Sequence, residues 1–489
     1  MPNPDPAEPQ ARDLTRREIV QAGASVFAGA ALSPALTAHE HSSSARRPNI
    51  ILLLGEGHRA DALSLAGHRI VETPNHDRIG REGVWFRNAF VTNALCAPAR
   101  AVTMTGMYSH ATGAVGNDTR HPLPASTQMF TDVLRKGGYE VALCGKAHIG
   151  AGAMDRYWDF YFGFNAASTN YYHPKIWTGR NGKISGPETY SGYADDIVTD
   201  HALDWLKQKR EKPFCLLLWF HAPHAPFYRA RRHLDLYNGL AIPKPDTFDD
   251  DRNGYPGKPR AFADADNKIG TTLLSDDDPR TLEELAKDYY AGLVDVDENI
   301  GRLFDWLTES GQLDETVILH CSDHGFFLGE WRMYDKRFMH EPSIRVPMMI
   351  RYPKVFPAGK VVDEMVLNLD IAPTLLDLAG LPIPSAMQGR SMVALGKAQD
   401  SGWRKDWLYE YYEYPGFQNV RPNRGVRSTK YKLIHYYLPP EEFELYDLEN
   451  DPGEKQNLYG DPKYAELTGQ LLARITELRR ETKDPALHA

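Results

Sequence analysis

The 489-residue sequence is poor in cysteine, lacks a long apolar run and has no excess of basic residues. Four cysteines in a chain of this length cannot build the dense disulfide framework of a small secreted domain. No apolar run reaches the ~18 residues that a membrane-spanning helix needs. Because 65 acidic residues outnumber 56 basic ones, we expect no nucleic-acid partner. The 42% hydrophobic and 25% charged content is typical of a globular protein of enzyme size.

Residues 1–47 predict an export signal and a linker rather than part of the fold. Arg16 and Arg17 precede an uncharged stretch, residues 22–38, that ends in small residues. A charged head before an apolar middle is typical of a signal peptide, and the arginine pair resembles a twin-arginine signal. A short amphipathic helix with a chance arginine pair is the alternative. If the signal is genuine, the twin-arginine machinery exports the chain to the bacterial periplasm or beyond.

Apolar runs alternate with helical patterns from about residue 48 onward. Four runs predict strands buried on both faces, at residues 50–54, 140–144, 214–220 and 317–321. Between Thr281 and Glu309, apolar residues recur every three or four positions, which predicts one long helix. Strands separated by helices indicate an α/β fold with a mainly parallel sheet between two helical layers.

Polar side chains follow each of the four predicted strands. The carboxyl ends of parallel strands meet at one edge of a sheet, where ligands commonly bind. The residues at these ends are Glu56 and His58, Lys146 and His148, His221 and His224, and Asp323 and His324. A single such residue is more often a cap or a turn residue. Because all four strand ends carry such polar residues, we predict one basic, metal-binding cleft.

The segment Cys96-Ala97-Pro98-Ala99-Arg100, followed by Thr105-Gly106, resembles the signature of the sulfatase family. Further blocks resemble the family in family order, at residues 73–78, 82–89, 145–148, 223–226, 322–325, 343–347, 370–374 and 444–448. The resemblance implies an alkaline-phosphatase-like fold, with a catalytic domain at residues 48–385. It also implies a smaller C-terminal subdomain at residues 386–489, formed by an antiparallel sheet and a helix.

The resemblance further implies sulfate ester hydrolysis. In the family, a formylglycine-generating enzyme oxidises the motif cysteine, and the hydrated aldehyde attacks sulfur and later expels sulfate. Carried onto this sequence, Cys96 becomes formylglycine and Arg100 holds its hydrate. Three side chains, Lys146, His148 and Lys336, bind the sulfate. His224 binds the ester side and protonates the leaving alcohol.

A divalent cation, usually calcium, is also implied by the resemblance. Its ligands would be Glu56, Cys96, Asp323 and His324. The family has two adjacent aspartates after the first strand, whereas this sequence has Glu56 and Gly57. Calcium prefers ~6–8 oxygen ligands, so we expect weaker binding unless water, sulfate or His58 completes the shell. Nitrogen donors could favour manganese or zinc, and a disabled site is the pessimistic alternative.

Several residues keep a second interpretation. Lys336 could belong to a charged surface turn, and His221 at most supports the site from behind. His340 and Glu341 either shape a substrate pocket or cap a helix. The three other cysteines, Cys144, Cys215 and Cys321, lie in or beside apolar strands and are expected to be buried reduced thiols.

The C-terminal part bears on the substrate. The aromatic run at residues 408–415, followed by residues 425–427, resembles bacterial N-acetylglucosamine-6-sulfatases and related glycan sulfatases. Aromatic side chains suit sugar rings, but plain core packing is the alternative. Three functions therefore stay open: a sulfatase acting on a sulfated carbohydrate or other sulfate monoester, a phosphomonoester or phosphonate-ester hydrolase on the same scaffold, and a sulfated-glycan-binding protein with a disabled metal site.

Overall fold

The computed structural model describes residues 47–117, 121–150, 154, 156–250, 258–267, 280–399 and 402–488. The predicted export signal and linker lie outside these residues, apart from Arg47. Within the described ranges, no helix combines the length and the apolar character that crossing a bilayer requires.

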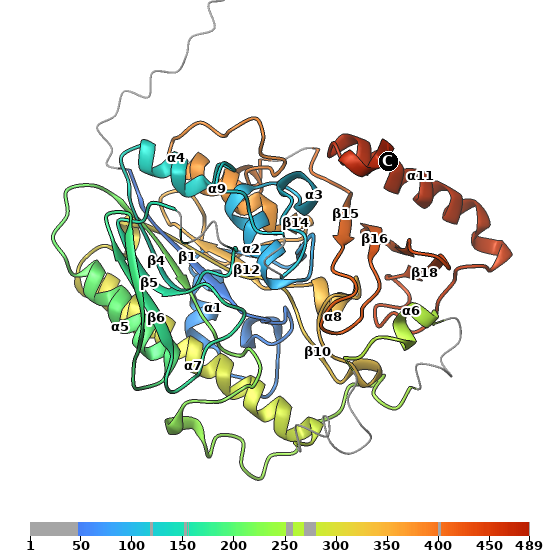
Figure 1. Ribbon diagram of the computed structural model, residues 1–489, viewed down its shortest axis with the longest axis horizontal. Helices are drawn as coiled ribbons and strands as arrows, with labels where there is room; N and C mark the ends of the chain where they lie inside the picture. The colour runs from blue at the N-terminus through green and yellow to red at the C-terminus, as the bar shows by residue number, and fades with distance from the viewer. Residues whose placement is uncertain are drawn as a thin grey trace, which may run out of the picture. The chain divides into compact units, whose positions relative to one another are not determined.

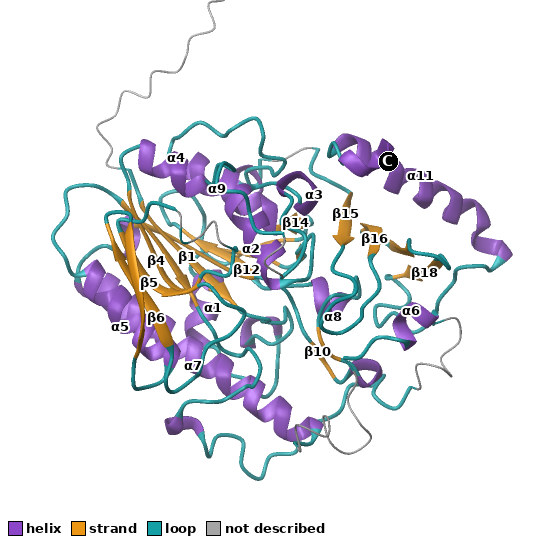
Figure 2. Cartoon of the chain, in the orientation of Figure 1, coloured by secondary structure: helices purple, strands orange, loops and turns teal. Residues whose placement is uncertain are grey.

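A ten-stranded sheet forms the framework, in the order β13-β2-β12-β9-β1-β8-β4-β5-β6-β7 (Figures 1 and 2). Its central strands are β1 (Asn49–Gly55), β4 (Glu140–Lys146), β8 (Phe214–Trp219) and β9 (Thr316–Ser322). These four pair in parallel, so their carboxyl ends meet at one edge. The outer strands are β2 (Val84–Phe86), β5 (Phe160–Phe164), β6 (Lys175–Arg180), β7 (Lys183–Thr189), β12 (Met348–Arg351) and β13 (Lys360–Val362).

The pairing is antiparallel at β12 and between β5, β6 and β7. The sheet is therefore mixed but mainly parallel at its centre. The four apolar runs read from the sequence all lie in its central strands, which confirms the predicted fold class.

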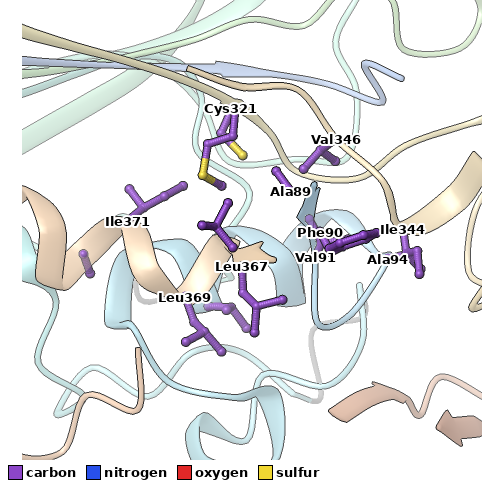
Figure 3. Packing of buried hydrophobic residues seen from close by; sticks show 14 of the residues in the cluster. Ala89, Phe90, Val91, Ala94, Cys321, Ile344, Val346, Leu367, Leu369 and Ile371 are labelled. Atoms are coloured by element: carbon purple, nitrogen blue, oxygen red, sulfur yellow. The ribbon is translucent and has the colours of Figure 1, made fainter. Parts of the chain in front are cut away.

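Helices cover both faces of this sheet (Figure 1). Leu52 of β1 lies in a core with α2 (Cys96–Thr105), α4 (Phe130–Lys136) and α9 (Ile371–Leu378). The next residue, Leu53, lies in a second core with α5 (Ala194–Leu206) and α7 (Leu282–Glu309). Successive side chains of a strand point to opposite faces, so a fully apolar β1 serves both cores. Figure 3 shows part of the first core, to which Cys321, Leu369 and Ile371 belong.

The predicted long helix is confirmed as α7. Thr281 caps it, since its hydroxyl accepts a hydrogen bond from the Glu284 N–H at 3.2 Å. The Glu284 carboxylate in turn accepts from the Thr281 N–H at 2.7 Å, which completes a capping box. Leu293 and Ile300 are among its buried residues, as their spacing predicts.

The C-terminal part contains a four-stranded antiparallel sheet, β15 (Asp406–Tyr411), β16 (Asn423–Ser428), β17 (Tyr431–Tyr436) and β18 (Glu442–Asp447). Helix α11 (Ala465–Glu481) buries Leu471, Ile475 and Leu478 and packs on this sheet (Figure 1). The expected smaller antiparallel sheet with a helix is thus present. The shorter elements are α1 (Pro74–Arg81), α3 (Ser109–Thr112), α6 (Arg260–Ala263), α8 (Glu341–Ile344), α10 (Val393–Gly396), β3 (Ala89–Phe90), β10 (Phe327–Leu328), β11 (Tyr334–Asp335) and β14 (Val366–Leu367).

All four cysteines are buried and free, as expected for Cys144, Cys215 and Cys321. Burial raises the pKa of each of these three thiols well above its ordinary value. Cys96 differs from them, because it begins α2 among charged side chains.

Candidate functional site

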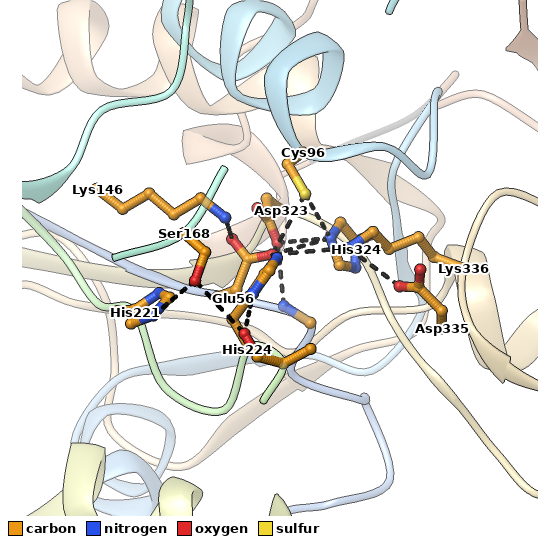
Figure 4. A network of polar contacts seen from close by, with 12 residues as sticks. Glu56, Cys96, Lys146, Ser168, His221, His224, Asp323, His324, Asp335 and Lys336 are labelled. Carbon is orange, nitrogen blue, oxygen red and sulfur yellow. Dashed lines mark hydrogen bonds and ion pairs between the residues drawn. The ribbon is translucent and has the colours of Figure 1, made fainter. Parts of the chain in front are cut away.

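Cys96 lies where the central strands end (Figure 4). Its Sγ is 3.3 Å from Glu56 Oε1, after β1, and 3.4 Å from His324 Nε2, after β9. Burial and the Glu56 charge raise the pKa of the thiol. Lys336, Lys146 and His324 outweigh them, so that this pKa lies well below its ordinary value. A sulfur in this setting is chemically unlike the three thiols of the core.

Arg100 lies one helical turn after Cys96 and connects the elements around it. Its guanidinium donates to Glu56 Oε2 at 2.7 Å, to Asp323 Oδ2 at 2.9 Å and to the Lys146 carbonyl at 2.5 Å. The side chain is fully buried, so these bonds offset the cost of burying the two carboxylates. Arg100 thereby holds the ends of β1, β4 and β9 together.

Two lysines add positive charge at the same place. Lys146 Nζ is 2.7 Å from Glu56 Oε2 and is fully buried. Lys336 Nζ is 3.8 Å from Glu56 Oε1 and 3.1 Å from Asp335 Oδ1. The Lys336 side chain is only 5% exposed, so the alternative of a charged surface turn is wrong. Both ammonium groups are placed to attract an anion.

Two histidines complete the set predicted from the sequence. His224 Nε2 is 3.8 Å from Glu56 Oε1, and its side chain is partly exposed. The His224 Nδ1 lies 2.7 Å from the Ala225 carbonyl, which directs Nε2 toward Glu56 (Figure 4). His148 lies beside Cys96 with a positive φ of 41°, and burial lowers its pKa to about 4. The structure therefore brings together all the residues proposed for catalysis.

The predicted metal ligands also converge. Glu56, Cys96, Asp323 and His324 each offer an atom within 4.8 Å of the others, and all four are buried. Burial and the neighbouring Glu56 raise the pKa of Asp323 to about 6. Burial alone would lower the pKa of His324, but Asp323 and Cys96 reverse this and raise it to about 9. Two buried carboxylates beside an imidazole form a donor set that fits a divalent cation.

Gly57 has a structural reason to be glycine. Its φ is 63°, in the left-handed region, and a Cβ there would lie 3.3 Å from His324 Cε1. Its N–H donates to Asp323 Oδ1 at 3.1 Å, and its carbonyl accepts from the Tyr289 hydroxyl at 2.6 Å. Gly57 thus orients a candidate ligand through its backbone. His58 does not complete the shell, because its ring groups with His76 and His320 instead.

A cavity of about 390 Å³ opens beside this cluster. Glu56, His224, His324 and Lys336 line one part of it. The remaining wall includes residues that sequence reasoning missed, among them Asn117, Phe326, Arg337, Glu413, Phe417 and Gln418. Arg337 adjoins Lys336 and Glu413 lies within the aromatic run, yet nothing in their spacing shows that they face the cavity.

Three other candidates lie outside the cavity wall. His221 stacks behind His224 with ring centroids 5.5 Å apart, in the supporting position expected. His340 is buried, accepts from Lys258 and contacts Glu444. Glu341 pairs with Arg427 and Lys432. The pocket-shaping role considered for His340 and Glu341 finds no support in this cavity.

Comparisons with known proteins agree with this geometry. The family described as Sulfatase matches residues 48–381, and the one described as N-sulphoglucosamine sulphohydrolase, C-terminal, matches residues 329–481. An N-acetylglucosamine-6-O-sulfatase of Bacteroides thetaiotaomicron is 35% identical, over 93% of this chain and 90% of that protein. A solved structure described as a complex with its substrate D-glucosamine-2-N,6-O-disulfate superimposes with a TM-score of 0.81 at 33% identity, over 90% of this chain and 99% of the other. A phosphonate monoester hydrolase of Agrobacterium radiobacter shares the fold, with a TM-score of 0.73 at 22% identity over 89% of this chain and 96% of that one.

Proposed function

Because the chain belongs to the sulfatase family, we propose that it removes a sulfate ester from a glucosamine-type residue of a sulfated glycan. The chain is a sulfatase, and the proposal concerns its substrate and its chemistry. The observation that carries the chemistry is the cluster around Cys96, in which three cationic side chains and two carboxylates surround one sulfur beside a cavity.

Cys96 is the proposed source of the nucleophile. Oxidation to formylglycine would replace its thiol by an aldehyde, whose hydrate carries the attacking oxygen. Arg100 lies one turn away on the same helix, where its fixed donors maintain the geometry of Glu56 and Asp323. Glu56, Asp323, His324 and residue 96 would hold a divalent cation, which would supply positive charge next to the sulfate.

The remaining side chains act on the substrate. The ammonium groups of Lys146 and Lys336 would donate to sulfate oxygens as negative charge develops there. His224 faces the cavity through Nε2, which suits proton transfer to the leaving alcohol. His148, which lies beside Cys96, completes the proposed sulfate clamp.

The substrate class is supported by two matches above 30% identity. One is named an N-acetylglucosamine-6-O-sulfatase, and the other was solved with a glucosamine disulfate. In this chain, Phe417 and Phe326 give the cavity apolar surface, while Arg337 and Glu413 give it polar groups of both signs. Such a wall suits an amino sugar, which carries both faces of ring carbon and polar substituents.

We propose calcium as the cation, with manganese or zinc as alternatives because His324 and Gly57 alter the donor set. We also propose that the formylglycine-generating enzyme and the twin-arginine machinery act on this chain, and that the mature protein works in the periplasm or outside the cell.

The test is turnover by protein made together with a formylglycine-generating enzyme. We expect release of sulfate from 6-O-sulfated N-acetylglucosamine or glucosamine-2-N,6-O-disulfate, and none from Cys96→Ala with unchanged circular dichroism. Peptide mass spectrometry across residue 96 should show the aldehyde in active protein. Faster turnover of a matched sugar phosphate, or full activity with an unmodified thiol, would contradict the proposal.

A further inference from the structure

Three histidines form a second buried cluster behind the candidate site. His58 follows β1, His76 lies on α1 and His320 lies in β9, so that the cluster joins three elements. Each ring offers one nitrogen within 4.8 Å of the other two. The ring centroids of His76 and His320 are 4.6 Å apart, and those of His58 and His76 are 5.2 Å apart. All three side chains are at most 1% exposed.

The hydrogen bonds leave one ring nitrogen of His58 and one of His76 with a free lone pair. His58 Nε2 lies 3.0 Å from the Ala62 carbonyl and must donate to it, which leaves Nδ1 unprotonated in a neutral ring. His76 Nδ1 lies 2.7 Å from Asp297 Oδ1, which likewise fixes the proton on Nδ1 and leaves Nε2 as an acceptor. Among the described residues, neither of these two free nitrogens has a hydrogen-bond partner.

His320 is the most unusual of the three. Neither of its ring nitrogens has a hydrogen-bond partner within the described part of the chain, although the side chain is fully buried in the central sheet. Burial, with His76 and His58 beside it, lowers its pKa well below the ordinary value, so the ring is neutral. A buried polar nitrogen without a partner lowers the stability of a fold, and this cluster contains several among the described residues.

We propose that His58, His76 and His320 bind a zinc-type divalent cation at a structural site separate from the Cys96 cluster. Neutral imidazoles are the preferred nitrogen ligands of Zn²⁺, at about 2.0–2.1 Å, which places nitrogen pairs about 3.4 Å apart in a tetrahedral shell. The nitrogens lie within 4.8 Å of one another, so the rings would have to turn slightly to reach this separation. A water molecule would occupy the fourth position.

The groups around the three histidines include the hydrogen-bond acceptors that such a site requires. Metal-binding histidines commonly donate their other N–H to a carboxylate or a backbone carbonyl. His76 donates to Asp297 and His58 to the Ala62 carbonyl, so two of the three rings have that arrangement. Asp297 itself accepts from the backbone N–H groups of Asn75 and His76, which holds it in place. Its charge would offset that of the cation.

The proposed cation would connect the residues that follow β1 to strand β9. His58 lies two residues after Glu56, and His320 three residues before Asp323. A cation that binds both would fix the separation of the β1 and β9 ends, on which the geometry of the Cys96 cluster depends. The proposed role is therefore structural, and its readouts are metal content and stability.

Two variants separate the two clusters. Cys96→Ser/His324→Asn removes the sulfur and imidazole ligands of the first cluster but keeps the carboxylates that pair with Arg100. His320→Leu, added to that variant, removes one ring of the second cluster in a background where the first cluster has already lost its sulfur and imidazole ligands. Each purified full chain is saturated with Zn²⁺ and then dialysed. Metal content, X-ray absorption and melting temperature with and without zinc are measured.

We expect Cys96→Ser/His324→Asn to retain one zinc per chain, bound through three imidazoles, and to melt higher with zinc than without it. His320→Leu should lose that zinc and the rise in melting temperature. If His320→Leu fails to fold, His58→Leu takes its place. The proposal is overturned if folded Cys96→Ser/His324→Asn binds no imidazole-coordinated zinc, which would indicate trapped water instead, or if His320→Leu retains the same zinc.

Discussion

The Cys96 cluster and the three-histidine cluster lie on either side of one short loop. Both contain buried polar groups, but the two clusters accommodate them in opposite ways. In the first, Arg100 and Lys146 neutralise Glu56 and Asp323 at distances of 2.7–2.9 Å. In the second, neutral rings face one another with free nitrogens among the described residues. Glu56 and His58 diverge because Gly57 between them takes a positive φ. Gly57 therefore separates the positively charged groups near Cys96 from the histidine nitrogens that have no partner among the described residues.

The largest effect is expected from a substitution that breaks the charge balance of the Cys96 cluster. Arg100→Met leaves two buried carboxylates without their shared partner, which should lower the free energy of unfolding by about 3–5 kcal/mol. His320→Leu in metal-free protein loses no hydrogen bond to the described residues, so a loss under about 1.5 kcal/mol is expected. Urea unfolding of both variants measures the contrast. Equal losses would mean that the two clusters do not differ as described.

The next effect concerns turnover. Lys146→Ala removes a donor held 2.7 Å from Glu56, and we expect the rate of sulfate release to fall by about 10²–10³-fold. Lys354→Ala is the matched control, because Lys354 is a half-exposed lysine paired with Glu315. A decrease shared by both variants, or absent from both, would show that Lys146 does not contact the sulfate.

A smaller effect is expected at the glycine between the clusters. Gly57→Asp and Gly57→Asn both add a Cβ at a φ of 63°, so each should cost about 1–2 kcal/mol of stability. Only the aspartate adds a charge near Asp323 and His324. We therefore expect Gly57→Asp to bind Ca²⁺ more tightly than Gly57→Asn in calorimetric titration. Equal affinities would place the cation elsewhere.

The last effect is a change in how stability depends on pH, and it arises next to the first cluster. Asp195 accepts from the N–H groups of His221 and Ala222 at 2.8 Å and so fixes the loop that holds His224. Burial raises the pKa of Asp195 to about 7, whereas its ordinary value is 3.8. The folded chain therefore keeps a proton that the unfolded chain loses. This contribution to stability is present below about pH 4 and is lost as the pH rises through 7.

Asp195→Asn should remove that contribution. The free energy of unfolding, from urea titrations between pH 4.5 and 7.5, should decline less steeply with pH in the variant, by no more than the ~1.4 kcal/mol per pH unit of a single proton. Unchanged slopes would indicate that Asp195 is ionised throughout this range.

The sequence predicts those features of the two clusters that depend on where a residue lies along the chain. The apolar run at residues 50–54 and the period of α7 predict their elements, and strand ends predict that Glu56, Lys146 and Asp323 converge. Side-chain direction is not readable in this way. His58 was considered for the same shell as Glu56, but the φ of Gly57 turns it away.

The side chains that line the cavity are likewise not predictable from the sequence. Arg337 and Glu413 reach one cavity from separate elements, and only the packed structure brings them together. The export signal lies outside the described residues, and the identity of the cation and the modification of Cys96 depend on chemistry beyond the folded chain, so these stay predictions. The division at residue 385 also stays a prediction.

The burial of Cys96 sets an order of events in the maturation of the protein. Only 1% of this residue is accessible, and α2 packs into the core from its first residue onward. The proposed oxidation requires an enzyme to reach a thiol that the fold buries, so that enzyme would have to act on the chain before α2 docks. A chain that folds first would be sealed as an inactive protein. Activity in a preparation would then report how synthesis, oxidation and folding competed in time, and adding the oxidising enzyme to folded protein would not restore it.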